Sequence, residues 1–145
     1  MIRIAGNHKL DATSERVWAA IYDPTTLVEL IPGCQHIEQV SPEEYQGQMQ
    51  VGLPAVNGTY DAHIRLMEYD EPRYCRFKGT VLGPTGTIEG EASFKLEEVE
   101  RQTVIEYEGQ AMVTGALAKL SPRFIEGVVN TLINQWMSQL NKLLQ

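Results

Sequence analysis

The sequence predicts an α+β fold in which a curved antiparallel sheet of about seven strands wraps around one long C-terminal helix. Most of the chain alternates apolar and polar residues with a period of two, which is typical of strands with one buried face. Residues 114–145 instead repeat apolar side chains every three or four positions, which places them along one side of a helix about 40 Å long. These apolar residues are Leu117, Leu120, Phe124, Val128, Leu132, Trp136, Leu140 and Leu143.

Two short helices are expected between the first strand and the rest of the sheet. Residues 2–10 alternate as a strand, and the hydrogen-bonding side chains of residues 11–14 then favour a helix start. Asp23-Pro24 divides the helical stretch in two, and Pro32-Gly33 ends its second half. The expected element order is therefore β-α-α-β-β-β-β-β-β-α.

The middle of the chain predicts six strands separated by turns. Proline and glycine mark the turns near residues 41–43, 70–72 and 83–86, and an irregular corner is expected at residues 53–58. The expected strands lie at residues 36–40, 45–53, 60–66, 75–81, 88–97 and 105–113.

Small side chains at inward-facing strand positions predict an internal cavity. A close-packed interior needs more volume than glycine and alanine supply. The alternative is that large aromatic side chains, Trp136, Phe124 and Phe77, simply fill the space between the sheet and the helix. The small inward residues are Gly47, Ala62, Gly79, Gly90, Ala92, Gly109 and Ala111.

Composition and charge narrow the function classes. The 145 residues are expected to form one domain, residues 1–145, with a core of ordinary size. A net charge of -7 and a pI near 4.9 argue against nucleic-acid binding and against electrostatic docking on anionic lipid. The first residues do not resemble a signal peptide, and no apolar run is long enough to span a bilayer. Cys34 and Cys75 predict neither a metal site nor a disulfide framework, so a reduced, cytoplasmic chain is expected.

Chemically active side chains are sparse at inward positions. His8 has inward parity, and it is either a core histidine bonded to protein or a ligand contact. Asp61, His63 and Arg65 alternate on one outward strand face opposite Glu89 and Glu91, as a solvated ion-pair face does. General acid–base catalysis needs a titratable group within reach of the substrate, so no catalytic residue and no metal or cofactor site is predicted.

Several motifs resemble a known family along the whole chain. The Asp11-Ala12, Val17-Trp18 and Asp23-Pro24 pairs resemble the START-like helix-grip superfamily, which includes polyketide cyclases and lipid-transfer domains. Within this superfamily the chain looks most like the family formed by the G subunit of carbon monoxide dehydrogenase. The motifs that carry this closer resemblance are Ile31-Pro32-Gly33-Cys34, Asp70-Glu71-Pro72-Arg73 and Gly115-Ala116-Leu117-Ala118-Lys119-Leu120.

The resemblance implies a curved sheet that grips a long helix around an apolar pocket. It also implies an accessory role for a molybdenum hydroxylase of the carbon monoxide dehydrogenase type, helping membrane or respiratory-chain coupling at the inner face of the membrane, with a quinone or lipid suiting the pocket. Three features depart from the family pattern. Leu53 stands where a second glycine is common, Pro122 interrupts the long helix, and the chain stops at Gln145 where many members continue into a membrane-binding tail.

The leading hypothesis is a non-catalytic protein that binds a hydrophobic molecule. The Pro-Gly turn of residues 31–34 is expected to form the cavity mouth: Ile31, Pro32, Gly33 and Cys34. The expected lining residues are Phe77, Phe94, Tyr107, Leu120, Phe124, Val128, Trp136, Tyr60 and His8.

Two other classes of protein remain open. An enzyme of the polyketide cyclase or dehydratase kind would need His8 and Tyr107 as its acid and base. A pure interaction module would have a closed cavity and would use the acidic outer face of its sheet to bind a basic partner.

Overall fold

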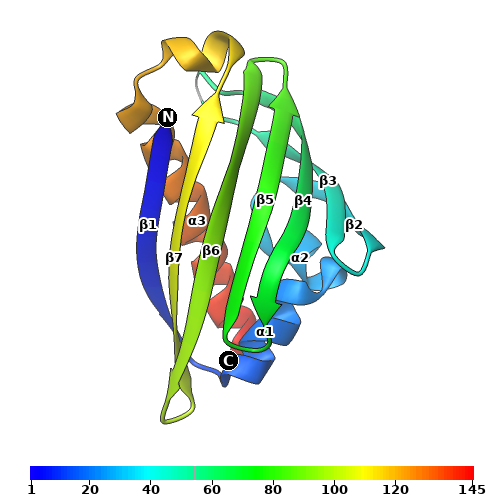
Figure 1. The fold of residues 1–145 in the computed structure, drawn as a ribbon, viewed down its shortest axis with the longest axis vertical. Helices are drawn as coiled ribbons and strands as arrows, with labels where there is room; N and C mark the ends of the chain where they lie inside the picture. The colour runs from blue at the N-terminus through cyan, green and yellow to red at the C-terminus, as the bar shows by residue number, and fades with distance from the viewer. Residues whose placement is uncertain (54) are drawn as a thin grey trace.

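The computed structural model describes residues 1–53 and 55–145 and contains one seven-stranded antiparallel sheet covered on one face by helices (Figure 1). The expected α+β fold class and element order are confirmed. Pro54, within the expected corner at residues 53–58, lies outside the described residues. The strands are β1 (Ile2–Leu10), β2 (Cys34–Ser41), β3 (Glu44–Val51), β4 (Gly58–Asp70), β5 (Tyr74–Gly83), β6 (Gly86–Val99) and β7 (Gln102–Val113).

The order of the strands in the sheet is β1-β7-β6-β5-β4-β3-β2, so the first two strands of the chain form opposite edges. Helices α1 (Ser14–Tyr22) and α2 (Pro24–Leu30) carry the chain from one edge to the other. The remaining strands follow one another as hairpins, and β7 returns to pair with β1. A third α-helix, α3 (Pro122–Leu144), runs along the same face of the sheet as α1 and α2 (Figure 1).

Side-chain caps define the helix starts that the sequence predicts. Thr13 caps α1 by accepting a hydrogen bond from Arg16 N, and Asp23 caps α2 by accepting one from Thr25 N at 3.0 Å. Pro24 fits the first turn of α2, where its missing N–H group has no intrahelical acceptor to lose. The Asp-Pro pair therefore ends one helix and begins the next.

The C-terminal helix differs from the single long stripe that the spacing predicts. A short 3₁₀ helix, η1 (Gly115–Lys119), comes first, and α3 begins only at Pro122 with Ser121 as its N-cap. The expected separation at Pro122 is confirmed, and α3 is about 34 Å long at the usual rise per residue. The chain between η1 and α3 is extended, so the helical spacing does not continue from one to the other. Counting every third or fourth residue onward from Leu117 therefore does not identify the side of α3 that faces the sheet. The buried side chains of α3 are Ile125, Met137, Leu140 and Leu144.

Two clusters of buried side chains lie between the sheet and the helices. The first joins α1 and the C-terminal half of α3 to the sheet, with Leu10, Val17 and Leu140 fully buried. The second lies under η1 at the other end of the sheet and centres on Tyr60 and Leu117. Residues of both clusters line an apolar cavity on this face of the sheet.

Candidate functional site

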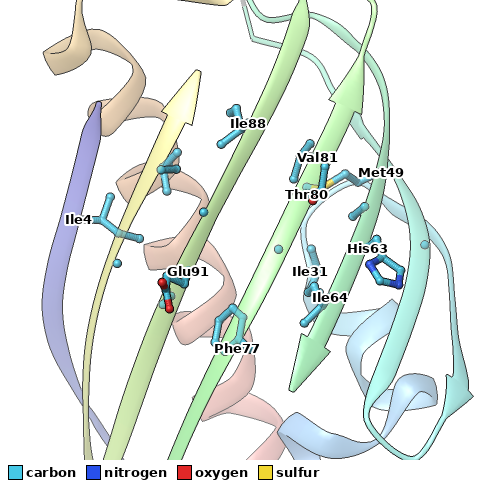
Figure 2. A pocket seen from close by; sticks show the side chains of 18 of the residues that line it. Ile4, Ile31, Met49, His63, Ile64, Phe77, Thr80, Val81, Ile88 and Glu91 are labelled. Carbon is cyan, nitrogen blue, oxygen red and sulfur yellow. The ribbon is translucent and has the colours of Figure 1, made fainter. Parts of the chain in front are cut away.

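The cavity lies between the inner face of the sheet and α3, and it has two adjoining chambers. The first, which we call the wide chamber, has a volume of about 330 Å³ and lies over the centre of the sheet (Figure 2). The second, which we call the aromatic chamber, has a volume of about 250 Å³ and lies against the first core cluster. The chambers adjoin because six residues line both: Ile4, Ile31, Ile37, Ile64, Phe77 and Ala92.

The floor of the wide chamber is a patch of small residues on five neighbouring strands. Gly79 of β5 pairs with Gly90 of β6, which in turn pairs with Ala111 of β7. On the other side, Gly47 of β3 pairs with Ala62 of β4. With little side chain at these positions, the strand backbone itself bounds the chamber. All seven small inward residues that the sequence singles out line it: Gly47, Ala62, Gly79, Gly90, Ala92, Gly109 and Ala111.

Polar residues at outward positions also border the wide chamber. His63 and Glu91, labelled in Figure 2, each directly follow one of the small residues, Ala62 and Gly90. On the outer surface Glu91 pairs with Arg76, with 3.3 Å between its Oε2 and the arginine Nη1. The chamber is therefore apolar inside, while the charged face of the same strands remains outside.

One side of α3 forms the wall opposite the sheet. Val129 lines the wide chamber, whereas Ile133, Trp136 and Met137 line the aromatic chamber. These four residues follow one another at helical spacing, so a single face of α3 spans both chambers. Of the four, only Trp136 is among the lining residues predicted from sequence, because the predicted stripe is out of phase with α3.

Aromatic rings surround the second chamber. Phe77, Phe94, Tyr107 and Trp136, four of the predicted lining residues, all border it. Trp18 closes it from α1, with 5.9 Å between its ring centroid and that of Phe94. The aromatic lining is expected because these strand residues have inward parity. Phe94 of β6 and Tyr107 of β7 are paired across the two strands and so lie on the same, inward face.

Two tyrosines of this chamber bond to the protein itself. Tyr45 Oη donates to the carbonyl oxygen of Tyr22 at 2.6 Å, and Tyr22 Oη donates to the carbonyl oxygen of Pro42 at 2.8 Å. Burial raises the pKa of the Tyr45 phenol, and it raises the pKa of the Cys75 thiol to about 11. These groups therefore stay protonated at neutral pH.

His8 and Tyr107 lie together at the edge of the aromatic chamber. Their rings stack with 6.0 Å between centroids and an angle of 8° between planes. Burial raises the pKa of the Tyr107 phenol. His8 is half-buried at an inward position, as its parity predicts, and it touches the chamber through Tyr107 rather than as one of its lining residues.

Four other predicted lining residues lie outside both chambers. Tyr60, Leu120 and Val128 belong to the second core cluster, and Tyr60 Oη donates to the carbonyl oxygen of Val56 at 2.7 Å. Phe124, in the first turn of α3, is 42% exposed. The lining positions that were not predicted include Ile4, Ile64 and Ile88, whose inward parity is readable from their strands.

The predicted mouth segment joins α2 to β2 beside the wide chamber. Ile31 and Cys34 line this chamber, and the backbone N–H of Gln50 donates to the Gly33 carbonyl oxygen at 2.8 Å. Gly33 has a φ of 76°, a left-handed conformation that favours glycine. Pro32 and Gly33 are absent from the lining of either chamber within the described residues. That this segment forms the cavity mouth stays a prediction.

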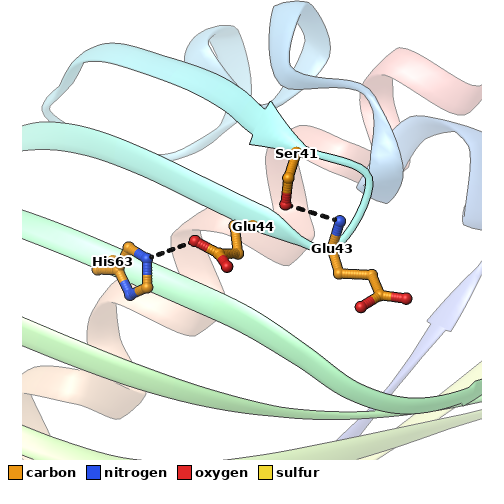
Figure 3. Close-up of polar contacts among 4 residues, drawn as sticks. All are labelled: Ser41, Glu43, Glu44 and His63. Carbon is orange, nitrogen blue, oxygen red and sulfur yellow. Dashed lines mark hydrogen bonds and ion pairs between the residues drawn. The ribbon is translucent and has the colours of Figure 1, made fainter.

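The outward polar residues of β4 do not form the arrangement expected of them. Strand β5 separates β4 from β6, so Asp61, His63 and Arg65 do not face Glu89 and Glu91. Instead His63 Nε2 lies 3.3 Å from Glu44 Oε2 on β3, near the turn where Ser41 Oγ accepts a hydrogen bond from Glu43 N (Figure 3). Both side chains of the pair are more than one-third exposed, so the pair contributes little to stability.

Side chains that could bind a metal ion are scattered over the fold. Within residues 1–53 and 55–145, His, Cys, Asp and Glu side chains nowhere form a group of three or more that could hold a metal ion.

Among the helices of the described chain, none is both long and apolar enough to cross a membrane.

The seven-stranded sheet and the long helix packed against its inner face define a START-like helix-grip fold. The sequence profile of the CoxG family, described as the G subunit of carbon monoxide dehydrogenase, matches residues 6–145. The chain therefore belongs to the CoxG family of carbon monoxide dehydrogenase subunits. A search of curated proteins found no match to the chain.

Solved structures support this assignment of the fold. A conserved protein from Geobacillus kaustophilus superposes with a TM-score of 0.94 at 28% identity, covering 99% of this chain and 95% of that one. A START superfamily protein from Mycobacterium smegmatis gives a TM-score of 0.77 at 9% identity, covering 98% and 96%. The di-domain ARO/CYC protein BexL of the BE-7585A biosynthetic pathway gives 0.72 at 15%, covering 98% of this chain and 46% of BexL. The last two likenesses concern the fold alone.

Proposed function

We propose that this protein is a non-catalytic accessory protein that binds a hydrophobic molecule, a quinone or another lipid, between its sheet and α3. It would serve a molybdenum hydroxylase of the carbon monoxide dehydrogenase type and help couple that enzyme to the membrane or to an electron acceptor. The observation that carries the proposal is the two-chambered apolar cavity over the small-residue floor. The family description, which names a subunit rather than a reaction, supports the accessory role.

Burial of apolar surface would supply the binding free energy. Each Å² of apolar ligand surface removed from water contributes about 25 cal/mol, before the cost of immobilising the ligand. The small-residue floor provides width for a branched or ring-bearing molecule, and the adjoining aromatic chamber extends the space along α3. A few polar groups are enough to orient a ligand in such a pocket.

The protonation states of side chains in the aromatic chamber support a non-catalytic function. A general base must be deprotonated near the working pH. Burial raises the pKa of Tyr45, Tyr107 and Cys75, so none of these three groups is a base at neutral pH. His8, stacked on Tyr107, is the remaining group on which an enzyme of the cyclase kind would depend.

Tryptophan fluorescence tests ligand binding directly. The chain has two tryptophans, Trp18 and Trp136, so a Trp18→Phe variant reports on Trp136 alone. Adding decylubiquinone to this delipidated variant is expected to quench the fluorescence with saturation, and native mass spectrometry is expected to detect a one-to-one complex. Unchanged fluorescence together with no bound quinone or co-purified lipid would reject the proposal.

The catalytic alternative has its own test. If the family fold acted here as a cyclase, replacing His8 with Ala would abolish turnover of a polyketide substrate while the protein still bound it. We expect no turnover in either the wild-type protein or the His8→Ala variant, and His8-dependent turnover would contradict the non-catalytic proposal.

A further inference from the structure

One of the three tyrosines that line the aromatic chamber makes no hydrogen bond to the described residues. The phenols of Tyr22 and Tyr45 both donate to backbone carbonyl oxygens. Tyr107 Oη, in contrast, has no hydrogen-bond partner among the described residues, although its ring lines the chamber. This hydroxyl is not sealed from solvent, so it is free to donate to water or to an acceptor on a molecule that enters the chamber.

A second unpaired donor lies on the same chamber. Trp136 Nε1 is sealed from solvent and has no acceptor among the described residues, and Trp136 lines the chamber from α3. Tyr107 Oη is not among the sealed atoms, so it can be reached without repacking. For this reason we assign the primary contact to Tyr107 rather than to Trp136.

Gly6 and His8 of β1 lie next to the Tyr107 ring. The phenol lies over Gly6 of β1, where a Cβ atom would come within 2.5 Å of the hydroxyl oxygen and 2.8 Å of the ring carbon that carries it. His8 stacks against the same ring. The glycine thus makes room for the phenol, and the histidine ring lies parallel to it.

The lining of the aromatic chamber also disfavours binding of a charged ligand group. The described residues that line it include no Lys, Arg, His, Asp or Glu. An ionised head group would lose its hydration there without an opposite charge in return. A neutral acceptor would lose less and could accept from the unused phenol.

We propose that the aromatic chamber holds the polar end of the ligand, that this end is a neutral carbonyl group, and that Tyr107 Oη donates the hydrogen bond that orients it. This inference rests on the proposed function, because it names the polarity and the orientation of the molecule bound in the same cavity. The apolar remainder of the ligand then occupies the wide chamber over the small-residue floor.

A set of compounds matched in chain length tests the inference. 2-Pentadecanone, pentadecane and pentadecanoic acid share an apolar chain and differ in a neutral carbonyl, no polar group and a carboxylate. Their affinities for delipidated wild-type protein at pH 7 are measured by native mass spectrometry and by the change in tryptophan fluorescence. We expect the ketone to bind about five-fold more tightly than the alkane, in keeping with one net hydrogen bond, and more tightly than the acid.

Three variants identify the donor. Tyr107→Phe keeps the ring and removes the hydroxyl, so it is expected to equalise ketone and alkane binding. Gly6→Ala keeps the hydroxyl but displaces it, and it is expected to reduce the preference for the ketone. Tyr74→Phe removes a phenol at an outward position of β5 and is expected to leave the preference unchanged. Thermal unfolding checks that each variant is folded, and Tyr107→Phe suffices if Gly6→Ala does not fold.

The outcomes separate this inference from the proposed function. Equal binding of ketone and alkane to the wild-type protein, or a preference that survives Tyr107→Phe, would overturn the inference while leaving hydrophobic ligand binding intact. A preference lost in Trp136→Phe but kept in Tyr107→Phe would overturn the assignment of Tyr107. If decylubiquinone binds but none of the three compounds does, the inference fails. If decylubiquinone does not bind either, the proposed function itself fails.

Discussion

Gly79 and Gly90 face each other across β5 and β6 at the centre of the cavity floor, yet the two positions differ in the space around them. A Cβ atom at Gly79 would meet nothing nearer than His63 O at 3.8 Å, which is an ordinary contact. A Cβ atom at Gly90 would come within 2.6 Å of Ala111 Cβ and would clash with the Gln110 carbonyl oxygen. One glycine therefore keeps the chamber open, and the other permits the close pairing of two strands.

Filling the floor at Gly79 is expected to exclude ligand without unfolding the protein. In Gly79→Leu, the new side chain extends into the wide chamber and occupies space that a ligand needs. Binding of decylubiquinone should weaken about ten-fold, equivalent to about 1.4 kcal/mol. The control is Gly127→Leu on the exposed side of α3, where an added Cβ meets no atom within 4 Å. Unchanged binding in Gly79→Leu would show that the ligand does not use this chamber.

Gly90→Ala is expected to destabilise the sheet, whereas Gly79→Ala is not. The added methyl group at Gly90 forces β6 and β7 apart, and overpacking of this kind costs about 1–3 kcal/mol. Urea unfolding of the two variants side by side measures the difference in the free energy of unfolding. Equal stabilities would mean that the strands relax around the extra methyl group at no cost.

The pair formed by Thr103 and Ser14 ties β7 to the start of α1. Thr103 is fully buried, and its Oγ1 donates to the Ala12 carbonyl oxygen at 2.7 Å and lies 3.3 Å from Ser14 Oγ. Thr103→Val keeps the shape but leaves two buried polar partners unsatisfied, which should reduce the free energy of unfolding by about 1–3 kcal/mol. The exposed Thr59→Val serves as a control and should change stability by less than about 0.5 kcal/mol. A smaller loss at Thr103 than at Thr59 would contradict this account.

Alkaline pH is expected to destabilise the protein through Cys75. Burial raises the pKa of this thiol from 9.0 to about 11 in the folded state, so the unfolded chain loses the proton first as the pH rises. Stability is therefore full below pH 9 and falls between about pH 9 and 11, by up to about 2 kcal/mol for this group. Urea unfolding at several pH values should show a shallower decline in Cys75→Ala than in wild type.

Two other expectations serve as controls for the pH dependence of unfolding. Burial also raises the pKa of Tyr45 and Tyr107, so a residual decline should persist in Cys75→Ala. Cys34, whose thiol is less buried, should account for a smaller part of the decline when it is replaced with Ala. An identical decline in wild type and Cys75→Ala would exclude the Cys75 thiol as its source.

Strand parity made most of the sheet predictable from sequence. Side chains in a strand alternate between two faces, so the inward position of Phe94, Tyr107 and the small floor residues follows from counting. Helix phase was less secure. Pro122 signalled a break correctly, but the number of residues in the extended link before α3 decides which side chains face the sheet. Phe124 was therefore placed inside and lies exposed, while Ile133 and Met137 were missed.

The relations between strands far apart in sequence could not be predicted in the same way. Alternation says that Asp61 and Glu89 point outward, but it does not say which strand lies between them. Similarly, Tyr60 has inward parity, yet it closes one end of the sheet over Gly83 instead of lining the cavity. Parity fixes the face of a residue, whereas the twist and order of the strands fix its place along that face.

Pairing of β1 with β7 joins parts of the chain that are synthesised far apart in time. Ile2 pairs with Ala111, and both line the wide chamber. During translation β1 therefore cannot pair until β7 has been synthesised, after nearly all of the sheet. The helix α3, which completes the cavity, is synthesised later still. Non-local pairing of this kind slows folding. The nascent chain consequently exposes its ligand-facing surface until α3 has been synthesised, and during that interval it depends most on protection from aggregation.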